Sequence, residues 1–252
     1  MEIRIVALTG IPTVRPGDNL AQLIADAIAR QALRLRADDV VVVCQKVVSK
    51  AEGRIVRMSA VVPGARAEQF AREFQKDPAL VEVALREAHE VLRMTGGHLI
   101  TATGPGFICA NSGLDRSNQN DPDEATLLPL DADRSAADLR RALGERLGIS
   151  PAVIISDTFG RPWRLGQLDF AIGAAGLAVL DDHAGRADRS GRTLEHTLIA
   201  VADQLAAASG LAAPKADGVP ACIVRGYDPR PPLPGAERAA DLVRPAADDL
   251  FR

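Results

Sequence analysis

Two short runs of β-branched residues, 40–43 (VVVV) and 153–155 (VII), most constrain the fold of this chain. Short apolar runs bounded by polar residues are typical of strands that are buried on both faces of a sheet. Further strands are predicted at 3–8, 99–100, 107–109 and 221–224. Segments with helical signals separate them, at 18–35, 67–75, from 77 onward, and at 135–147, 193–209 and 236–250. This mixture indicates an α+β or α/β protein.

The composition excludes several classes of protein. With 252 residues, 47% of them hydrophobic, and a net charge of −3, the chain is too apolar and too weakly charged to be mainly disordered. The length allows one large domain or two small ones. The absence of a bulk positive charge and the 3% share of aromatic residues argue against a nucleic-acid partner.

The expected compartment follows from the termini and the cysteines. The chain starts without a signal-peptide core, and no apolar run approaches the roughly 20 residues of a membrane span. Three widely separated cysteines without a CxxC pair argue against a cysteine zinc site and fit a reducing compartment. We therefore expect a soluble, cytoplasmic protein with no membrane partner.

Two candidate phosphate-binding regions follow predicted strands, which is where open α/β sheets bind ligands. A glycine at the turn 10–12 would let the backbone approach a ligand closely, although an ordinary turn explains the same residues. The segment 45–50 follows the run at 40–43, and Lys46 and Lys50 share a face only if it is helical. Two ammonium groups there would suit phosphate oxygens, and solvated surface lysines are the alternative.

Oxygen-bearing side chains are concentrated in two further regions. Asp115 and Asn118 lie in the polar segment 111–123 and either offer the hard oxygen ligands that Mg²⁺ and Mn²⁺ prefer or form a structural turn. Asp157 and Thr158 follow the second β-branched run and would suit a metal site that also holds phosphates.

Basic and polar residues extend the second of these regions. Arg161 and Arg164 bracket the only tryptophan, Trp163, and could bind carboxylates or phosphates through two hydrogen bonds each. Three downstream residues could line the same cleft: Gln167, Asp169 and Gly173. The segment 214–220 is either a turn or reaches a nucleotide.

The absence of several catalytic motifs narrows the range of reactions that the chain could catalyse. The chain has no HExxH sequence, no nucleophile–histidine signature and neither common glycine-rich nucleotide loop. The residues alone therefore favour metal-assisted phosphoryl chemistry over hydrolysis by an activated nucleophile.

Four motifs, in order along the chain, resemble the coenzyme F420-0:γ-glutamyl ligase family. They are GIP at 10–12, VVSKAEG at 47–53, CANSGLDRSN at 109–118 and ISDTFGRPWR at 155–164. The resemblance extends from about residue 5 to about residue 225, and 244–251 is similar to the family's C-terminal ending. It implies an α+β fold of two intertwined parts, with 1–252 as a single unit and no C-terminal nitroreductase-like domain.

The activity that the resemblance implies is that of a GTP-dependent amide ligase. Members of the family join L-glutamate to coenzyme F420-0 through an acyl phosphate and release GDP and phosphate. The resemblance also implies two divalent sites for Mg²⁺ or Mn²⁺, K⁺ as an activator, and a homodimer.

Site residues are carried over by position. The nucleotide-binding positions correspond to Gly10, Ile11, Pro12, Gln45, Lys46, Lys50, Asn118, Lys215, Ala216, Asp217 and Gly218. Asp115, Asp157 and Thr158 would ligate metal; Lys46, Lys50 and Asp157 would act in catalysis; and Arg161, Trp163 and Arg164 are expected to bind substrate. Archaeal relatives have an oxygen-bearing ligand where this chain has Lys215. Either Asp217 substitutes for it, or the lysine replaces part of one metal's charge.

Two other functions fit the same residues. A different metal-dependent phosphotransferase or ligase would also combine a metal with lysines, and a comparison of GTP, ATP and UTP would separate it. A non-catalytic module that binds a nucleotide or a deazaflavin would bind its ligand without releasing phosphate.

Overall fold

The computed structural model describes residues 2–215, 217–231 and 237–249. Its centre is a five-stranded sheet in the order β1–β12–β2–β8–β9. The strands are β1 (Arg4–Ala7), β2 (Val40–Cys44), β8 (Ala152–Arg161), β9 (Arg164–Ala175) and β12 (Ala221–Arg225). β2 and β8 are parallel, and the other neighbours are antiparallel. The two β-branched runs are therefore adjacent inner strands, both buried as predicted, and the α+β class is confirmed.

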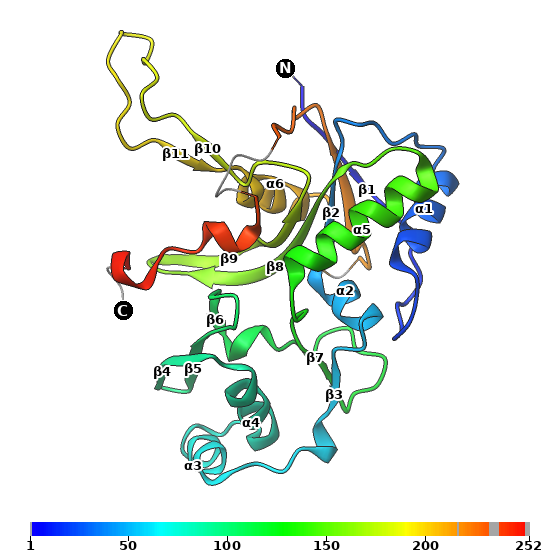
Figure 1. Cartoon of the computed structure of the whole chain (residues 1–252). Coiled ribbons are helices and arrows are strands. Elements are labelled where there is room, and N and C mark those ends of the chain that lie inside the picture. The colour runs from blue at the N-terminus through cyan, green and yellow to red at the C-terminus, as the bar shows by residue number, and fades with distance from the viewer. Residues whose placement is uncertain (1, 216, 232–236, 250–252) are drawn as a thin grey trace.

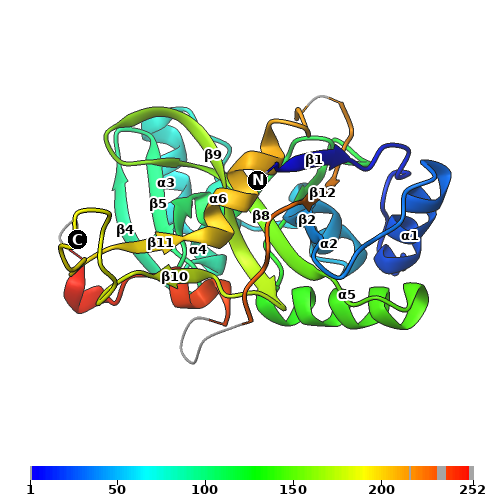
Figure 2. The same cartoon turned by 90° about the horizontal axis from the view of Figure 1, so that it is seen from above.

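Helices cover both faces of this sheet (Figure 2). α1 (Leu20–Arg30) and α5 (Ala132–Leu147) pack together on one side, and α6 (Val201–Gly210) lies on the other. Their apolar stripes and the strands form one aliphatic core. Asn19 caps α1, because its side chain accepts a hydrogen bond from Gln22 N. α5 begins three residues before the predicted start, because the Asp131 side chain accepts a hydrogen bond from a backbone N–H of its first turn.

Two aspartates attach the covering helices to β9. The pairing of β8 with β9 contains a register shift between Ile155 and Ser156. Asp203 of α6 accepts a hydrogen bond from Ala171 N at 2.9 Å, and Asp133 of α5 accepts one from Ala174 N at 2.8 Å. Burial raises the pKa of both carboxyl groups. Both helices are thus attached to β9 by side-chain hydrogen bonds.

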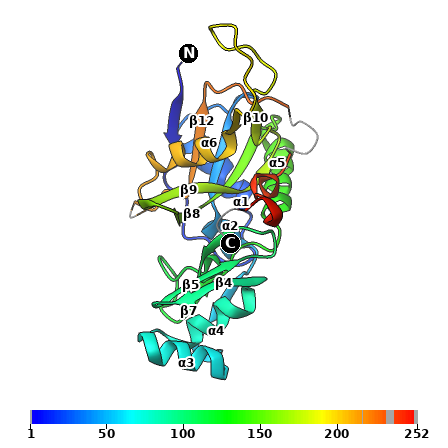
Figure 3. The same cartoon turned by 90° about the vertical axis from the view of Figure 1, so that its left-hand side faces the viewer.

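Residues 54–130 form a smaller second part, inserted between α2 (Gln45–Ala51) and α5. Its elements are β3 (Ile55–Arg57), η1 (Met58–Ala60), α3 (Ala65–Phe74), α4 (Pro78–Glu87), β4 (Glu90–Thr95), β5 (His98–Ala102), β6 (Ile108–Ala110), η2 (Asn111–Gly113) and β7 (Glu124–Thr126). β3 pairs with β7, and β4, β5 and β6 form an antiparallel sheet. Figures 1 and 3 show this part beyond one end of the central sheet, with small cores of its own.

The structure corrects the sequence prediction around β8 and α6. The strand predicted at 153–155 continues to Arg161, because the polar residues after it pair with β9 in a hairpin. The helix predicted at 193–209 is instead a strand, β11 (Leu198–Ala200), followed by α6. β11 pairs with β10 (Leu180–Asp182), so its apolar residues serve a two-stranded sheet rather than a helix face.

The C-terminal prediction is also wrong in part. The helix predicted at 236–250 is replaced, within residues 237–249, by the 3₁₀ helices η3 (Ala239–Leu242) and η4 (Ala246–Asp248). Pro245 lies between them and cannot continue an α-helix. Residues 236 and 250 lie outside the described residues. Among the helices that the structure describes, none is both long enough and apolar enough to cross a membrane.

The first prediction concerns Gly173 on β9. A Cβ atom there would lie 2.2 Å from the backbone oxygen of Ala132, so Gly173→Ala must push α5 away from the sheet. We expect a loss of about 3 kcal/mol in the free energy of unfolding, measured by urea denaturation. Gly104→Ala is the control, because a Cβ atom at Gly104 would meet nothing within 4 Å. Equal stability of the two variants would contradict this packing.

Candidate active site

A cleft of about 320 Å³ lies where β2 ends and β8 continues. The β2–β8 pairing stops at Cys44 opposite Ser156, and the chain turns at once into α2. Beyond this point β8 has β9 on one edge and the cleft on the other. Both parts of the molecule contribute walls, since α2 belongs to the first part and Asp115 and Asn118 belong to the second.

Most of the predicted site residues line this one cleft. They are Ile11, Pro12, Gln45, Lys46, Lys50, Asp115, Asn118, Asp157, Thr158, Lys215 and Gly218. Segments that are more than 100 residues apart in the chain therefore meet at a single site. The lysine face requires 45–50 to be helical, and α2 confirms that it is.

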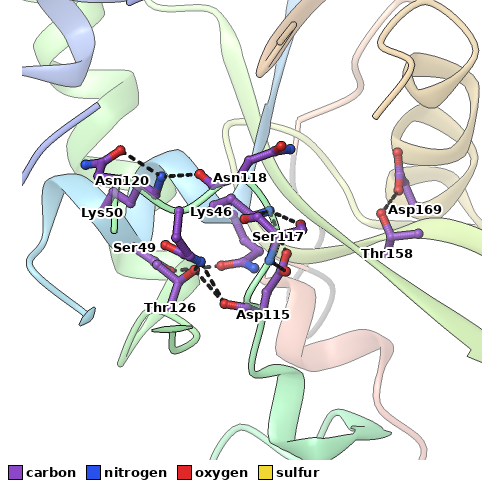
Figure 4. A network of polar contacts seen from close by, with 12 residues as sticks. Lys46, Ser49, Lys50, Asp115, Ser117, Asn118, Asn120, Thr126, Thr158 and Asp169 are labelled. Carbon is purple, nitrogen blue, oxygen red and sulfur yellow. Dashed lines mark hydrogen bonds and ion pairs between the residues drawn. The ribbon is translucent and has the colours of Figure 1, made fainter. Parts of the chain in front are cut away.

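Lys46 joins the two parts through an ion pair with Asp115 (Figure 4). The Lys46 Nζ lies 2.8 Å from Asp115 Oδ2 and also donates to the backbone oxygen and the hydroxyl of Ser117. Ser117 N donates to the other carboxylate oxygen of Asp115 at 2.7 Å. Burial raises the pKa of Asp115, but the hydrogen bonds from Lys46 and Ser117 hold it below its ordinary value. Asp115 is thus an ionised carboxylate whose two oxygens are already in use.

Lys50 is a buried cation one turn further along α2. Its Nζ donates to the backbone oxygen of Asn118 at 2.7 Å and lies 3.4 Å from Asn120 Oδ1. Its exposed fraction is 4%. Desolvation and the nearby Lys46 charge lower the pKa of Lys50. An anion in the cleft would relieve both effects, because it would compensate two ammonium groups at once.

Asp157 is a carboxylate without a full counter-charge. Burial raises its pKa to about 6, and Asp115 adds to the rise, while a backbone hydrogen bond, Lys215 and Gln45 oppose it. The Gln45 side chain is itself buried, and Ser49 Oγ donates to its Oε1 at 2.9 Å. A cation beside Asp157 would favour the ionised form.

Thr158 and Asp169 form a separate pair across the hairpin. They are register partners on β8 and β9, and the Thr158 hydroxyl donates to Asp169 Oδ1 (Figure 4). Because side chains alternate along a strand, this pair lies on the opposite face of β8 from Asp157. The sequence pattern placed Asp169 in the cleft but gave it no role, since the pairing with Thr158 depends on the hairpin register. Gln167 and Gly173 do not line the cleft.

Several predicted residues lie away from the cleft lining. The carbonyl of Gly10 accepts a hydrogen bond from Arg30 at 2.7 Å, and Asp217 lies beyond the residues that line the cleft. Arg161, Trp163 and Arg164 are at the tip of the β8–β9 hairpin, where Trp163 is 80% exposed. Ala216 lies outside the described residues. The cleft also contains polar residues that the motifs did not single out: Thr13, Cys44, Ser117, Ser156, Ser209 and Cys222.

The donor set fits a divalent cation that shares its coordination with a ligand. Within the described residues, no group of three or more His, Cys, Asp or Glu side chains could hold a metal alone. Mg²⁺ in phosphate-handling sites commonly uses one or two carboxylates together with phosphate oxygens and water. Asp157, with its uncompensated charge, and Asp115 supply carboxylates of this kind beside two lysines.

The comparisons with known proteins agree on one family. The sequence profile described as F420-0:Gamma-glutamyl ligase matches residues 10–226. A coenzyme F420:L-glutamate ligase of Methanothermobacter thermautotrophicus is 43% identical over 253 residues, which cover 100% of both chains. A protein of the same name from Methanopyrus kandleri is 43% identical, covering 95% of this chain and 93% of the relative. The relative from Haloarcula marismortui is 41% identical over 90% of this chain and 88% of its own.

The second prediction tests the ion pair that closes the cleft. A double-mutant cycle with Lys46→Met and Asp115→Asn should give a coupling energy of about 1 kcal/mol in urea unfolding, because the pair is largely shielded from solvent. The matched control is Arg134→Met with Asp138→Asn on α5, an exposed pair 3.8 Å apart, which should show no measurable coupling. Additive effects in the first cycle would mean that the two side chains do not interact in solution.

Proposed function

The chain belongs to the F420-0:γ-glutamyl ligase family, and from this premise we propose that it joins L-glutamate to coenzyme F420-0 with GTP as the energy source. The observation that carries the proposal is the convergence of two lysines and two aspartates, from distant segments, in one cleft. This inventory suits phosphoryl transfer, which needs positioning and charge neutralisation more than a protein nucleophile.

The proposed reaction has two steps. A carboxylate is a poor electrophile, so its oxygen must first become a better leaving group. Transfer of the GTP γ-phosphoryl group to the carboxylate of F420-0 gives an acyl phosphate and GDP. The glutamate amine then attacks the acyl carbon, and phosphate leaves as the amide forms.

The two lysines are proposed to hold the phosphates throughout. The ammonium group of Lys46 contacts the Asp115 carboxylate and two oxygens of Ser117, and that of Lys50 donates to the backbone oxygen of Asn118. Phosphate oxygens carry more negative charge than the carbonyl oxygens and would make stronger hydrogen bonds than these do. The loop 115–120 would then be positioned by the same lysines that bind the nucleotide.

We also propose that the reaction requires metal ions. Asp115, Asp157 and Thr158 would hold Mg²⁺ or Mn²⁺ at two sites, with K⁺ as a further activator. When bound, the divalent ions would neutralise charge on the phosphate groups. The protein's own contribution is to keep the Asp157 carboxylate desolvated and available beside them.

The remaining binding roles follow the cleft and the hairpin. The residues proposed to surround the nucleotide are Ile11, Pro12, Gln45, Asn118, Lys215 and Gly218, with Gly10 and Asp217 at the margins. Arg161, Trp163 and Arg164 would reach the anionic coenzyme from the hairpin tip.

The apolar residues exposed at the tip of the β8–β9 hairpin, with Leu165 fully exposed, support association with a second copy of the chain. We place this homodimer in the cytoplasm, where free cysteines persist.

The direct test is mass spectrometry of coenzyme F420-0 after incubation with GTP, Mn²⁺ and L-glutamate. We expect a mass gain that corresponds to one or more glutamyl units, with GDP and phosphate in matching amounts. Parallel reactions with ATP and UTP should give less product. Nucleotide hydrolysis or binding without any glutamyl product would overturn the proposal.

The next prediction isolates Asp157. Asp157→Asn keeps the size of the side chain but removes the charge, so ligation at saturating Mn²⁺ should fall at least about 100-fold. Mn²⁺ affinity, titrated by calorimetry with GDP present, should fall in parallel. Asp138→Asn, on the exposed face of α5, is the control and should change neither quantity. Near-normal ligation by Asp157→Asn would exclude this carboxylate as a metal ligand.

A further inference from the structure

The cleft has a second wall on the α6 face of the sheet. Thr158 and Asp169 lie on this face, and Ser209, near the end of α6, lines the cleft beside them. Of the three groups proposed to hold metal, Asp115 and Asp157 approach from the other side of β8, and Thr158 lies on this wall. Asp169 and Ser209 on the same wall have no role in the proposed binding of phosphate and metal.

Asp169 is the charged group of this region. Its Oδ1 accepts the Thr158 hydroxyl, which orients the carboxylate. Its Oδ2 lies against Gly210, where a Cβ atom would come within 2.6 Å of it. Among the described residues, no lysine, arginine or histidine forms an ion pair with Asp169, whereas Asp115 has Lys46 at 2.8 Å. The structure thus holds a fixed carboxylate in a cleft without a protein cation beside it.

A cationic group of a substrate is the partner that fits this carboxylate best. Two small polar residues, Ser156 and Ser209, line the cleft together with Asp169. Apolar residues that could contact a purine base also line the cleft, among them Ile11, Pro12 and Val14. The proposed reaction has one cationic substrate group, the α-ammonium group of the incoming amino acid.

We propose that Asp169, oriented by Thr158, binds the α-ammonium group of the amino-acid substrate. This inference rests on the proposed ligase function and adds the location of the amine. It places the amine at the hairpin, on the face of β8 opposite Asp157. Asp169 would accept one proton from the ammonium group, and the resulting neutral amine would add to the carbonyl face of the acyl phosphate. The C–N bond forms, the C–O bond to phosphate then breaks, and phosphate carries away the second proton.

The test compares glutamate with glutarate, which has the same carboxylates but no amine. In Asp169→Asn, the KM for glutamate should rise at least about tenfold, because a charge-assisted hydrogen bond is lost. The KM for GTP and the inhibition constant of glutarate should change less than twofold. The Asn side chain can still accept the Thr158 hydroxyl, so this contact is preserved.

A second variant near Asp169 and a control variant on α5 complete the test. Gly210→Ala should displace the Asp169 carboxylate and raise the glutamate KM to an intermediate value, whereas Asp138→Asn should leave it unchanged. Hydroxylamine, a neutral nucleophile, should still trap the acyl phosphate as a hydroxamate in Asp169→Asn.

Three outcomes would overturn the inference. An unchanged glutamate KM would exclude Asp169 from amine binding. An equal loss of hydroxamate formation would assign it to the phosphate or metal chemistry, and a changed preference among GTP, ATP and UTP would assign it to the base. If the wild-type protein forms neither amide nor hydroxamate, the proposed function itself fails.

Discussion

The contacts of Lys46 and Lys50 with the loop 115–120 are the constraint on which the site depends. Both lysines lie on one face of α2, and their partners belong to the inserted second part. These contacts hold the loop against α2, which follows the end of β2, and so contribute to the two walls of the cleft. The same ammonium groups are the strongest anion-binding groups there. Assembly of the two parts and the proposed binding of phosphate therefore depend on the same two lysines.

The charges around the cleft are unevenly compensated. Asp115 is neutralised by Lys46, whereas burial raises the pKa of Asp157 and lowers the pKa of Lys50. Both shifts mean that the protein holds ionisable groups where water solvates them poorly. A well-packed apolar cleft would be more stable, so the retained charges are best explained by a ligand that compensates them. A nucleotide phosphate accompanied by a cation carries both of the signs that are needed.

Local signals explain which elements could be predicted from the sequence. The β-branched runs and the helix that starts after Asp77 depend on neighbouring residues, and the structure confirms them. Residues 198–200 carry apolar positions that suit a helix equally well, and only their pairing with β10 makes them a strand. The extension of β8 through Asp157 to Arg161 likewise depends on β9. The secondary structure of these segments depends on which strand they pair with, and a single sequence does not reveal that pairing.

The same distinction applies to the site. Motifs on separate segments identified the phosphate and metal candidates, because each carries its own chemical signature after a strand or turn. The position of one motif relative to another depends on the parallel pairing of β2 with β8 and on the insertion of 54–130. The contact between Thr158 and Asp169 depends on a hairpin register that includes a shift, which local spacing does not reveal.

Early termination of β2 allows side chains from both faces of β8 to line one cleft. A strand with neighbours on both edges exposes its two faces to different layers of the protein, so adjacent residues do not meet the same ligand. Where β2 stops at Cys44, β8 loses its neighbour on that edge, and side chains from both of its faces can reach the same cleft. Asp157 on one face and Thr158 with Asp169 on the other therefore line one cleft. This arrangement suits the proposed reaction, in which one site must bind both an anionic phosphate and a cationic amine.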